Sequence, residues 1–468
     1  MDLRSIYAPA HFGNFYELAS KGEMLGLFEE WARWGINGAG TWFDPADSVD
    51  PFGESELFRW AREKPIAEWR RKRDFLLAAR EAGLTTTLVV TPNAAFIDQL
   101  RPDLAASAGD ENYIGPNLCP SKPEARAILV RNFENLLRFL SDGGAALDFV
   151  LVAFRDWGGC DCPECRPWLK TALALWTDEF MPALARRFPE AKVQFCTWWV
   201  TEGELRHLMD VVAKSPAWLD GINLSLGYGC ELPKIDLPAP FRKTVFLHIG
   251  YATEKGDKYG TKGAVVSPAR LERQMRMMDT LGMAGFQAYS EGIYDDLNKF
   301  LVAQLGMDST VSARDLVGDY CRVCFGTERG ETDDLVGAIY ALETIEADPS
   351  RAEEADRVFE AVGRLRRLGG DWRFAQLAVR AKVALFESQI GSKEKWERES
   401  AGLGPVVFAD YIKHIDALVE DRRSVLEYLE RGVYRVGPQI HGLGIELDCA
   451  AWQEWKRTAR ATPKQLGG

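Results

Sequence analysis

The stretch DFVLVAFRDWGGCDCPEC, residues 148–165, starts as an apolar run of strand-forming residues and ends in charged, glycine-rich and cysteine-rich sequence. Seven similar runs occur before about residue 307, and amphipathic helical patterns separate most of them. Strands that alternate with helices are typical of repeated βα units in a parallel sheet. The eight predicted strands lie at residues 5–10, 38–44, 85–93, 148–156, 192–199, 221–228, 244–251 and 285–292.

Eight βα units in about 300 residues fit a closed (β/α)8 TIM barrel better than an open doubly wound sheet. Residues 23–35 and 269–285 have helical spacing, whereas the proline-rich link at residues 230–243 predicts no full helix. From about Ser309 on, only helical periodicity is found. We therefore predict a barrel over residues 1–308 and an all-α domain over residues 309–468.

Composition restricts the class of protein. The 468 residues, 46% of them hydrophobic, are enough for a large domain and a smaller one. The formal charge of −12 disfavours a nucleic-acid partner, and no run is long enough to cross a membrane. The start MDLRSIYAPA lacks a secretory pattern, so we expect a cytoplasmic protein, although a signal cleaved beforehand would leave the same sequence. A homo-oligomer is one alternative that the sequence leaves open.

In this fold the chemistry lies where strands end at their carboxyl side, so polar and aromatic residues there are candidate site residues. Any one aromatic residue among them could simply belong to the core. Several together predict platforms that stack against sugar rings, with carboxylates and histidine binding the hydroxyls. The residues at the predicted strand ends are His11, Trp42, Asp44, Asn93, Arg155, Asp156, Trp157, Trp198, Trp199, Tyr228, His248, Tyr251, Tyr289 and Glu291.

Two carboxylates stand out among these residues. Asp156 ends the fourth strand beside Arg155, whose guanidinium could steady it, and a structural ion pair on a loop is the alternative. Glu291 ends the eighth strand after an apolar run. For Asp295 and Asp296, helix capping is favoured over catalysis, and Asp295 is kept as a candidate substrate-binding residue.

The nine cysteines are an odd number and unevenly spread, which favours thiols or metal ligands over a disulfide framework. Cys160, Cys162 and Cys165 could share one tetrahedral zinc ion, with Cys119 as the fourth ligand because strands three and four are neighbours. Free thiols or a disulfide are the alternatives. A structural zinc would clamp the loop that carries Asp156, and no organic cofactor is expected.

Another cysteine pair, Cys321 and Cys324, lies alone within a helical pattern. Packing on the same helix face explains its spacing better than a metal site does.

The loop GGCDCPEC, the segment NLCPSKPEAR and the run YSEGIYDDLNK, followed by a helix ending in CFG, resemble bacterial carbohydrate-active barrels. These include the β-hexosaminidase-like and α-glucuronidase-like glycoside hydrolases. The resemblance implies a glycosidase that acts on a carbohydrate substrate such as an oligosaccharide. The hexosaminidase-like enzymes carry paired acids at the end of strand four, whereas this chain has Arg155 beside Asp156. Substrate-assisted cleavage of an N-acetylated sugar is therefore not expected.

Asp156 and Glu291 form the predicted catalytic pair, one as acid and the other as base. Strands four and eight lie opposite each other in such a barrel, which favours the wider carboxylate separation of inverting enzymes, about 6.5–9.5 Å. A second hypothesis is a sugar isomerase or epimerase whose divalent metal is held by Asp44, Asp156, His248 and Glu291. A third is a sugar-binding barrel without catalysis.

Overall fold

The computed structural model describes most of the chain up to residue 390. The described residues are 1–10, 14–43, 45, 48–53, 62–107, 117–156, 159–226, 232, 235–250, 263–290, 292–348, 351, 354–365 and 372–390.

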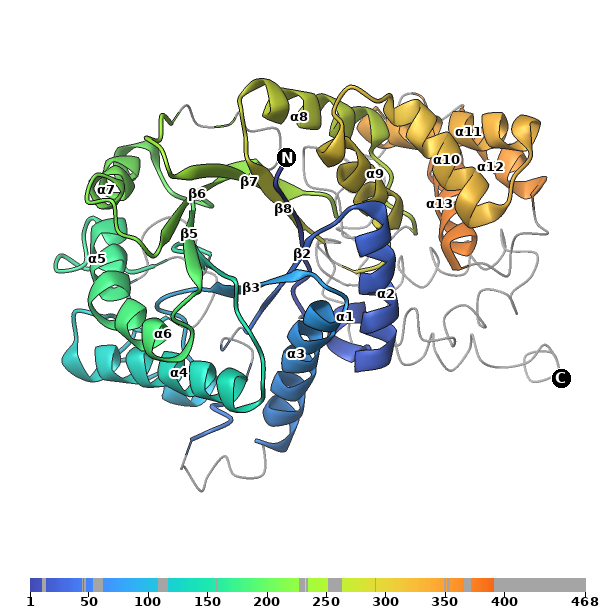
Figure 1. Cartoon of the computed structure of the whole chain (residues 1–468). Coiled ribbons are helices and arrows are strands. Elements are labelled where there is room, and N and C mark those ends of the chain that lie inside the picture. The colour runs from blue at the N-terminus through green and yellow to red at the C-terminus, as the bar shows by residue number, and fades with distance from the viewer. Residues whose placement is uncertain are drawn as a thin grey trace, which may run out of the picture. The chain divides into compact units, whose positions relative to one another are not determined.

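Eight parallel strands close into a barrel in the order of the chain, as Figure 1 shows. This confirms the predicted fold class. The strands are β1 (Leu3–Tyr7), β2 (Gly38–Trp42), β3 (Thr85–Val90), β4 (Phe149–Ala153), β5 (Lys192–Cys196), β6 (Leu219–Leu226), β7 (Arg242–His248) and β8 (Gly285–Tyr289). Each lies within or overlaps a predicted run, but most end a few residues before it does. Among the described candidates, Trp42, His248 and Tyr289 are the last residues of their strands, whereas Asn93, Arg155, Asp156, Trp198 and Trp199 lie after the strands end.

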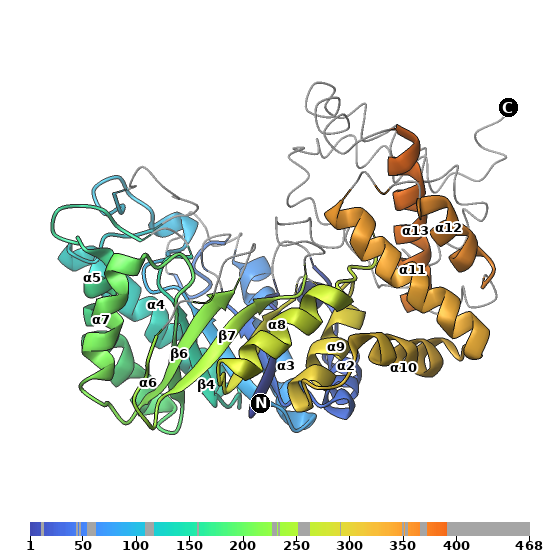
Figure 2. The same ribbon diagram turned by 90° about the horizontal axis from the view of Figure 1, so that it is seen from above.

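Helices cover the outside of the strands, and Figure 2 shows β6 and β7 side by side with α7 outside them. The helices that follow β1 to β5 are α1 (Phe15–Leu18), α2 (Lys21–Trp34), α3 (Glu63–Glu81), η2 (Ile97–Gln99), α4 (Pro123–Asp142), α5 (Trp168–Leu175), η3 (Trp176–Phe180), α6 (Met181–Arg187) and α7 (Glu202–Val212). In the described part of the link between β6 and β7 there is no helix, as the prolines predict.

Local sequence explains where α2 begins and ends. Ser20 and Glu23 form a capping box at its start. Gly35 ends it with a φ of 104°, a conformation that favours glycine. The buried face of α2 then packs on α3, where the rings of Phe28 and Phe75 lie 4.7 Å apart.

The interior of the barrel is more polar than the apolar strand pattern predicts. Buried amides and hydroxyls from several strands hydrogen-bond to one another, since a buried polar group without a partner costs free energy. The Gln287 amide donates to Gln194 Oε1 at 3.2 Å, and Asn223 Nδ2 donates to Thr244 Oγ1 at 2.9 Å. These contacts tie β5 to β8 and β6 to β7 across the interior.

The chain divides into two compact units. The first comprises residues 1–11, 16–247 and 278–289 and holds the barrel strands apart from the last residue of β7. The second comprises residues 12–15, 248–277 and 290–468. Its described helices are α8 (Pro268–Thr280), α9 (Asp296–Met307), α10 (Ala313–Phe325), α11 (Arg329–Ala347), α12 (Ala355–Gly363) and α13 (Trp372–Ile390). The last residues of α8, from 278 on, belong to the first unit. The predicted domain boundary at residue 308 stays a prediction.

Buried polar contacts join the helices within the second unit. Asp296 of α9 accepts hydrogen bonds from the Tyr320 hydroxyl at 2.7 Å and from Arg373 Nε at 2.6 Å. Glu343 of α11 accepts from the backbone N–H groups of Ala269 and Arg270, both at 2.9 Å, at the start of α8. A carboxylate at a helix N-terminus is favourable because the helix dipole is positive there.

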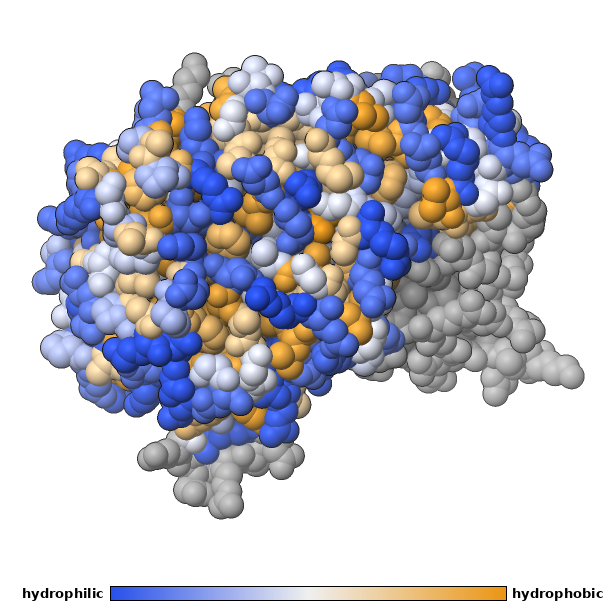
Figure 3. Space-filling model, in the orientation of Figure 1, coloured by the Kyte–Doolittle hydropathy of each residue, from blue (hydrophilic) through white to orange (hydrophobic). Residues whose placement is uncertain are grey.

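Hydrophilic side chains are dispersed over the face that Figure 3 shows and separate its hydrophobic patches. Among the described helices, none combines the length and the apolar character that crossing a bilayer requires.

Candidate active site and cysteine cluster

Aromatic side chains gather at the carboxyl ends of the barrel strands. Tyr7 ends β1 and Tyr289 ends β8, and the two residues are register partners with ring centroids 5.4 Å apart. Phe246 of β7 lies 5.8 Å from Tyr7 and 5.7 Å from Tyr289. Trp198, two residues after β5, lies 5.9 Å from Phe246. This aromatic cluster forms the top of the barrel core, and Trp42 is buried within the same core.

Asp156 lies at the edge of the aromatic cluster. Its Oδ1 accepts a hydrogen bond from the indole N–H of Trp198 at 3.0 Å. Removal from water disfavours the charged form and raises the pKa of the Asp156 carboxyl to about 6. The hydrogen bond from Trp198 favours the charged form and lowers this pKa, but its effect is the smaller of the two. Asp156 is therefore a carboxyl group that keeps its proton up to about pH 6, well above the usual range, at the end of the barrel where catalytic groups lie in this fold.

Trp199 is the exposed member of the group. Its side chain is 44% exposed, and its ring lies 4.8 Å from that of Trp198. Its φ of 58° lies in the left-handed region, which a bulky residue seldom adopts. Such backbone strain persists where the surrounding structure holds it, often at functional sites. The structure thus places an indole face in solvent beside the residue that contacts Asp156.

Arg155 does not steady Asp156, contrary to that expectation. Its Nε and Nη2 donate to the two carboxylate oxygens of Glu204, at 3.0 and 2.6 Å. Burial on its own would raise the pKa of Glu204. The hydrogen bonds and positive charge of Arg155 outweigh this effect of burial, and the pKa of Glu204 lies below its usual value. Arg155 is part of a structural ion pair, but its partner is Glu204 and not Asp156, so the alternative of an Arg155–Asp156 pair on the loop is not observed either.

The partner Glu204 was missed in the sequence, although a signal for it exists. Thr201 and Glu204 have the spacing of a capping box, and the structure confirms one at the start of α7. Glu204 Oε1 also accepts from the backbone N–H of Leu169 at 3.3 Å. One carboxylate therefore joins α5, α7 and the loop after β4.

The loop after β4 is also fastened by Asn93 from the end of β3. The buried Asn93 amide donates to the carbonyl oxygens of Gly159 at 3.1 Å and Leu118 at 3.3 Å. Gly159 has a φ of 82°, and a Cβ there would lie 2.6 Å from the Trp168 ring. Only glycine fits this turn, so the local sequence and the packing of α5 fix the path of the loop together.

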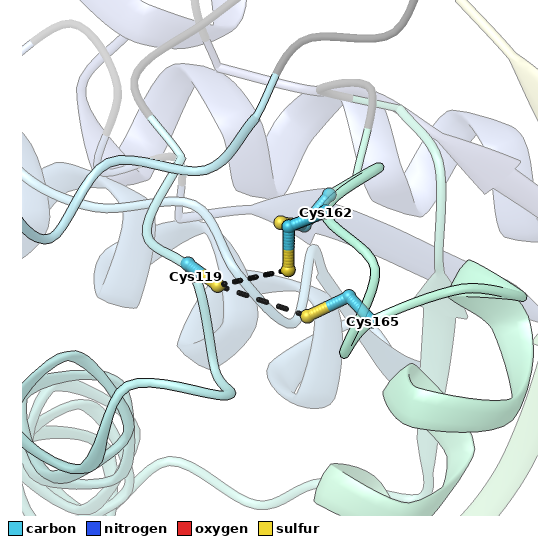
Figure 4. Close-up of side chains that lie close together, drawn as sticks. Cys119, Cys162 and Cys165 are labelled. Atoms are coloured by element: carbon cyan, nitrogen blue, oxygen red, sulfur yellow. Dashed lines mark hydrogen bonds between the residues drawn. The ribbon is translucent and has the colours of Figure 1, made fainter.

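The four predicted metal-ligand cysteines come together beside this turn. The sulfur atoms of Cys119, Cys160, Cys162 and Cys165 all lie within 4.8 Å of one another. Figure 4 shows Cys119, Cys162 and Cys165 with their sulfurs pointing toward one another. Cys119 Sγ lies 3.7 Å from both Cys162 Sγ and Cys165 Sγ. The described cysteines are all free thiols, so the disulfide alternative is not observed there.

Cys321 and Cys324 both lie on α10, as predicted. Cys321 is buried and Cys324 half-buried. Within the described residues they are not part of a group that could hold a metal ion.

His248 is the last residue of β7 and belongs to the second unit. Burial, together with the positive charge of Arg270, lowers the pKa of the His248 imidazole to about 3. The Arg270 guanidinium donates to the His248 carbonyl oxygen at 3.0 Å. The imidazole is therefore neutral at physiological pH and could bind a substrate hydroxyl or a metal only in that form.

Asp295 is at the N-cap position of α9 but makes no side-chain capping bond. Its carboxylate instead forms a buried ion pair with Lys299 and accepts from the Ser290 hydroxyl at 3.0 Å. The capping interpretation of Asp295 and Asp296 was therefore wrong for the side chains. Both are taken up by contacts within the second unit, because burial requires a partner for each charge.

Six predicted site residues lie outside the described residues. They are His11, Asp44, Trp157, Tyr228, Tyr251 and Glu291.

No family model matches the sequence, and no curated protein matches it. Solved structures do resemble its fold. A GH138 enzyme targeting pectin rhamnogalacturonan II matches 98% of this chain and 67% of its own, with a TM-score of 0.55 and 9% identity. This neighbour is a glycoside hydrolase.

Two further structures match with lower scores. The O-GlcNAc hydrolase of Thermobaculum terrenum has a TM-score of 0.43 and 12% identity, over 99% of this chain and 98% of its own. The pneumococcal enzyme StrH has a TM-score of 0.43 and 10% identity, over 82% of this chain and 98% of its own. The match to the GH138 enzyme, with its TM-score of 0.55, shows in the fold the likeness to glycoside hydrolases that the sequence predicted.

Proposed function

We propose that this protein is a glycoside hydrolase in which Asp156 donates the proton to the leaving group. The observation that carries the proposal is the environment of Asp156. The carboxyl group of Asp156, half-buried just after β4, keeps its proton up to about pH 6 and accepts a hydrogen bond from Trp198, which lies beside the exposed Trp199. The barrel fold shared with glycoside hydrolases supports the proposal.

A general acid must be protonated at the working pH and still be strong enough to give the proton up. Efficiency is highest when its pKa lies near that pH. The pKa of Asp156, about 6, meets this condition, whereas the usual value of 3.8 would leave the group almost fully ionised. The Trp198 N–H favours the carboxylate that remains after transfer and so assists the release of the proton.

The aromatic residues supply a surface for a sugar ring. Trp199 is 44% exposed, and Trp198 and Tyr289 are half-buried at the top of the aromatic cluster. The apolar face of a pyranose stacks on an indole, while its hydroxyls remain free for hydrogen bonds. This arrangement is compatible with a carbohydrate substrate.

The reaction requires a second carboxylate, for which Glu291 after β8 is the candidate. Asp156 protonates the glycosidic oxygen while the bond from that oxygen to the anomeric carbon breaks. Water attacks the anomeric carbon, and its proton passes to Glu291. β4 and β8 lie opposite each other in the order of the barrel, which favours room for a water molecule and hence inversion.

The experiment uses Asp156→Asn and a series of aryl glycosides whose leaving groups differ in basicity. Loss of a general acid should reduce kcat/KM about 10²–10⁴-fold for basic leaving groups and much less for acidic ones, which need no proton. Asp178→Asn, at an exposed position of η3, is the matched control and should keep the wild-type rate. Glu291→Gln should lose activity with every leaving group.

Retained activity in both the Asp156 and Glu291 variants would contradict the assignment, as would absence of turnover over hexosides, deoxyhexosides, hexuronides and N-acetylhexosaminides. The configuration of the first product, followed by NMR, tests inversion. Activity that is lost in a chelator and restored by Mn²⁺ or Mg²⁺ would instead support the sugar isomerase or epimerase. Ligand binding without turnover would support the non-catalytic barrel.

A further inference from the structure

We propose that Cys119, Cys160, Cys162 and Cys165 bind one zinc ion in a closed structural site that fastens the loop after β3 to the loop after β4. The site does not depend on the proposed hydrolase activity. It is argued from the distances between the sulfurs, their burial and the contacts around them.

The distances between the sulfurs suit a single tetrahedral ion. A zinc–sulfur bond of about 2.3 Å places the corners of a regular tetrahedron about 3.8 Å apart. Dashed lines in Figure 4 join Cys119 Sγ to Cys162 Sγ and to Cys165 Sγ, and both of these distances are 3.7 Å. A disulfide would need about 2.05 Å, so these pairs are not bonded to each other. A multi-iron cluster would hold the sulfurs farther apart, because each binds a different iron atom.

The ligand set indicates a structural role. All four positions are filled by protein sulfurs, which leaves no position open for water or substrate. Cys119, Cys160 and Cys165 are buried and Cys162 is half-buried.

Neighbouring polar groups support the sulfurs as outer-shell partners do in metal sites. The backbone N–H of Ser107 donates to Cys160 Sγ at 3.4 Å. The Ser121 hydroxyl lies 2.9 Å from Cys119 Sγ. Both contacts reduce the repulsion among the negatively charged sulfurs that would surround the ion.

The ion would join segments that are distant in the sequence. Cys119 follows Leu118, whose carbonyl oxygen accepts from Asn93, and Cys160 follows Gly159, which accepts from the same amide. The backbone N–H of Asp161 donates to the Ser107 carbonyl oxygen at 3.0 Å. Zinc would therefore reinforce an existing set of contacts and fix the end of the loop that begins at Asp156.

The test begins with metal analysis of the full chain purified without chelators. Stoichiometric zinc is expected in the wild type and should be lost in Cys162→Ser. Cys324→Ser in α10 is the matched control and should keep its zinc. Cys321 and Cys324 have the same Cys-x-x-Cys spacing as Cys162 and Cys165, but among the described residues they are not part of a group that could hold a metal ion.

A second measurement uses only wild-type protein, in case the variants fail to fold. After chelation, four additional thiols should react with a thiol reagent, and the melting temperature should fall. Zinc should restore both properties, Mg²⁺ should not, and Co²⁺ should give the absorption of a tetrahedral thiolate site. Substoichiometric zinc together with no thiolate absorption from Co²⁺ would overturn the proposal, as would iron in place of zinc or the mass of two disulfides.

Discussion

Replacing Asp156 by asparagine should stabilise the protein at neutral pH, and this gain in stability should shrink as the pH falls toward 4. The reason is that the folded state holds this carboxyl group in an environment that disfavours its charge. Its pKa rises from 3.8 to about 6 because the group is removed from water. Asparagine keeps the shape and can accept the same hydrogen bond from the Trp198 N–H, but it carries no charge.

The sign follows from proton linkage. A folded-state pKa above the unfolded value means that ionisation favours the unfolded state. The penalty is absent below about pH 3, where both states are protonated, grows as the pH rises through 3.8 toward 6, and is complete above about pH 7. The full pKa shift of Asp156 corresponds to about 3 kcal/mol of unfolding free energy. Because the side chain is half-buried and partly screened by solvent, we expect an effect of about 2 kcal/mol. For a unit of about 250 residues this is a difference of about 5 °C in melting temperature.

The assay is thermal unfolding of wild type and Asp156→Asn from pH 4 to pH 8. The melting temperature of Asp156→Asn should exceed that of the wild type by an amount that increases with pH and becomes constant above pH 7. Other titrating groups are common to both proteins and cancel in the difference. Asp178→Asn, whose side chain is exposed, should run parallel to the wild type. A difference for Asp156→Asn that is constant with pH would refute the reasoning, as would one of opposite sign.

Two buried ion pairs give further predictions, both measurable by urea unfolding. Arg155→Met should lower the unfolding free energy by about 3 kcal/mol, because it leaves the Glu204 carboxylate buried without its bidentate partner; a loss below about 0.5 kcal/mol would contradict this. Lys299→Met should cost about 3–5 kcal/mol, since both Lys299 and Asp295 are almost fully buried. The double variant Lys299→Met with Asp295→Asn should recover a large part of that loss, and an additive result would show that the pair is not coupled.

The order of the barrel and most of its helices follow from local sequence. Runs of β-branched and apolar residues, such as residues 85–90, alternate with helical patterns, and these residue types favour strands. The sequence also predicted that Cys119 joins the other three cysteines, since β3 and β4 are adjacent. Spacing along one chain segment and adjacency of consecutive strands are both readable without coordinates.

What the sequence alone determined is therefore the barrel, the order of its strands and the grouping of the four cysteines. Only the tertiary structure decided which groups pair there: Trp198 with Asp156 across 42 positions, and Arg155 with Glu204 across 49. Helical and strand periodicity arise from contacts between near neighbours in the chain. Hydrogen-bond and charge partners between loops depend on strand register and loop path, which are set only when the barrel closes.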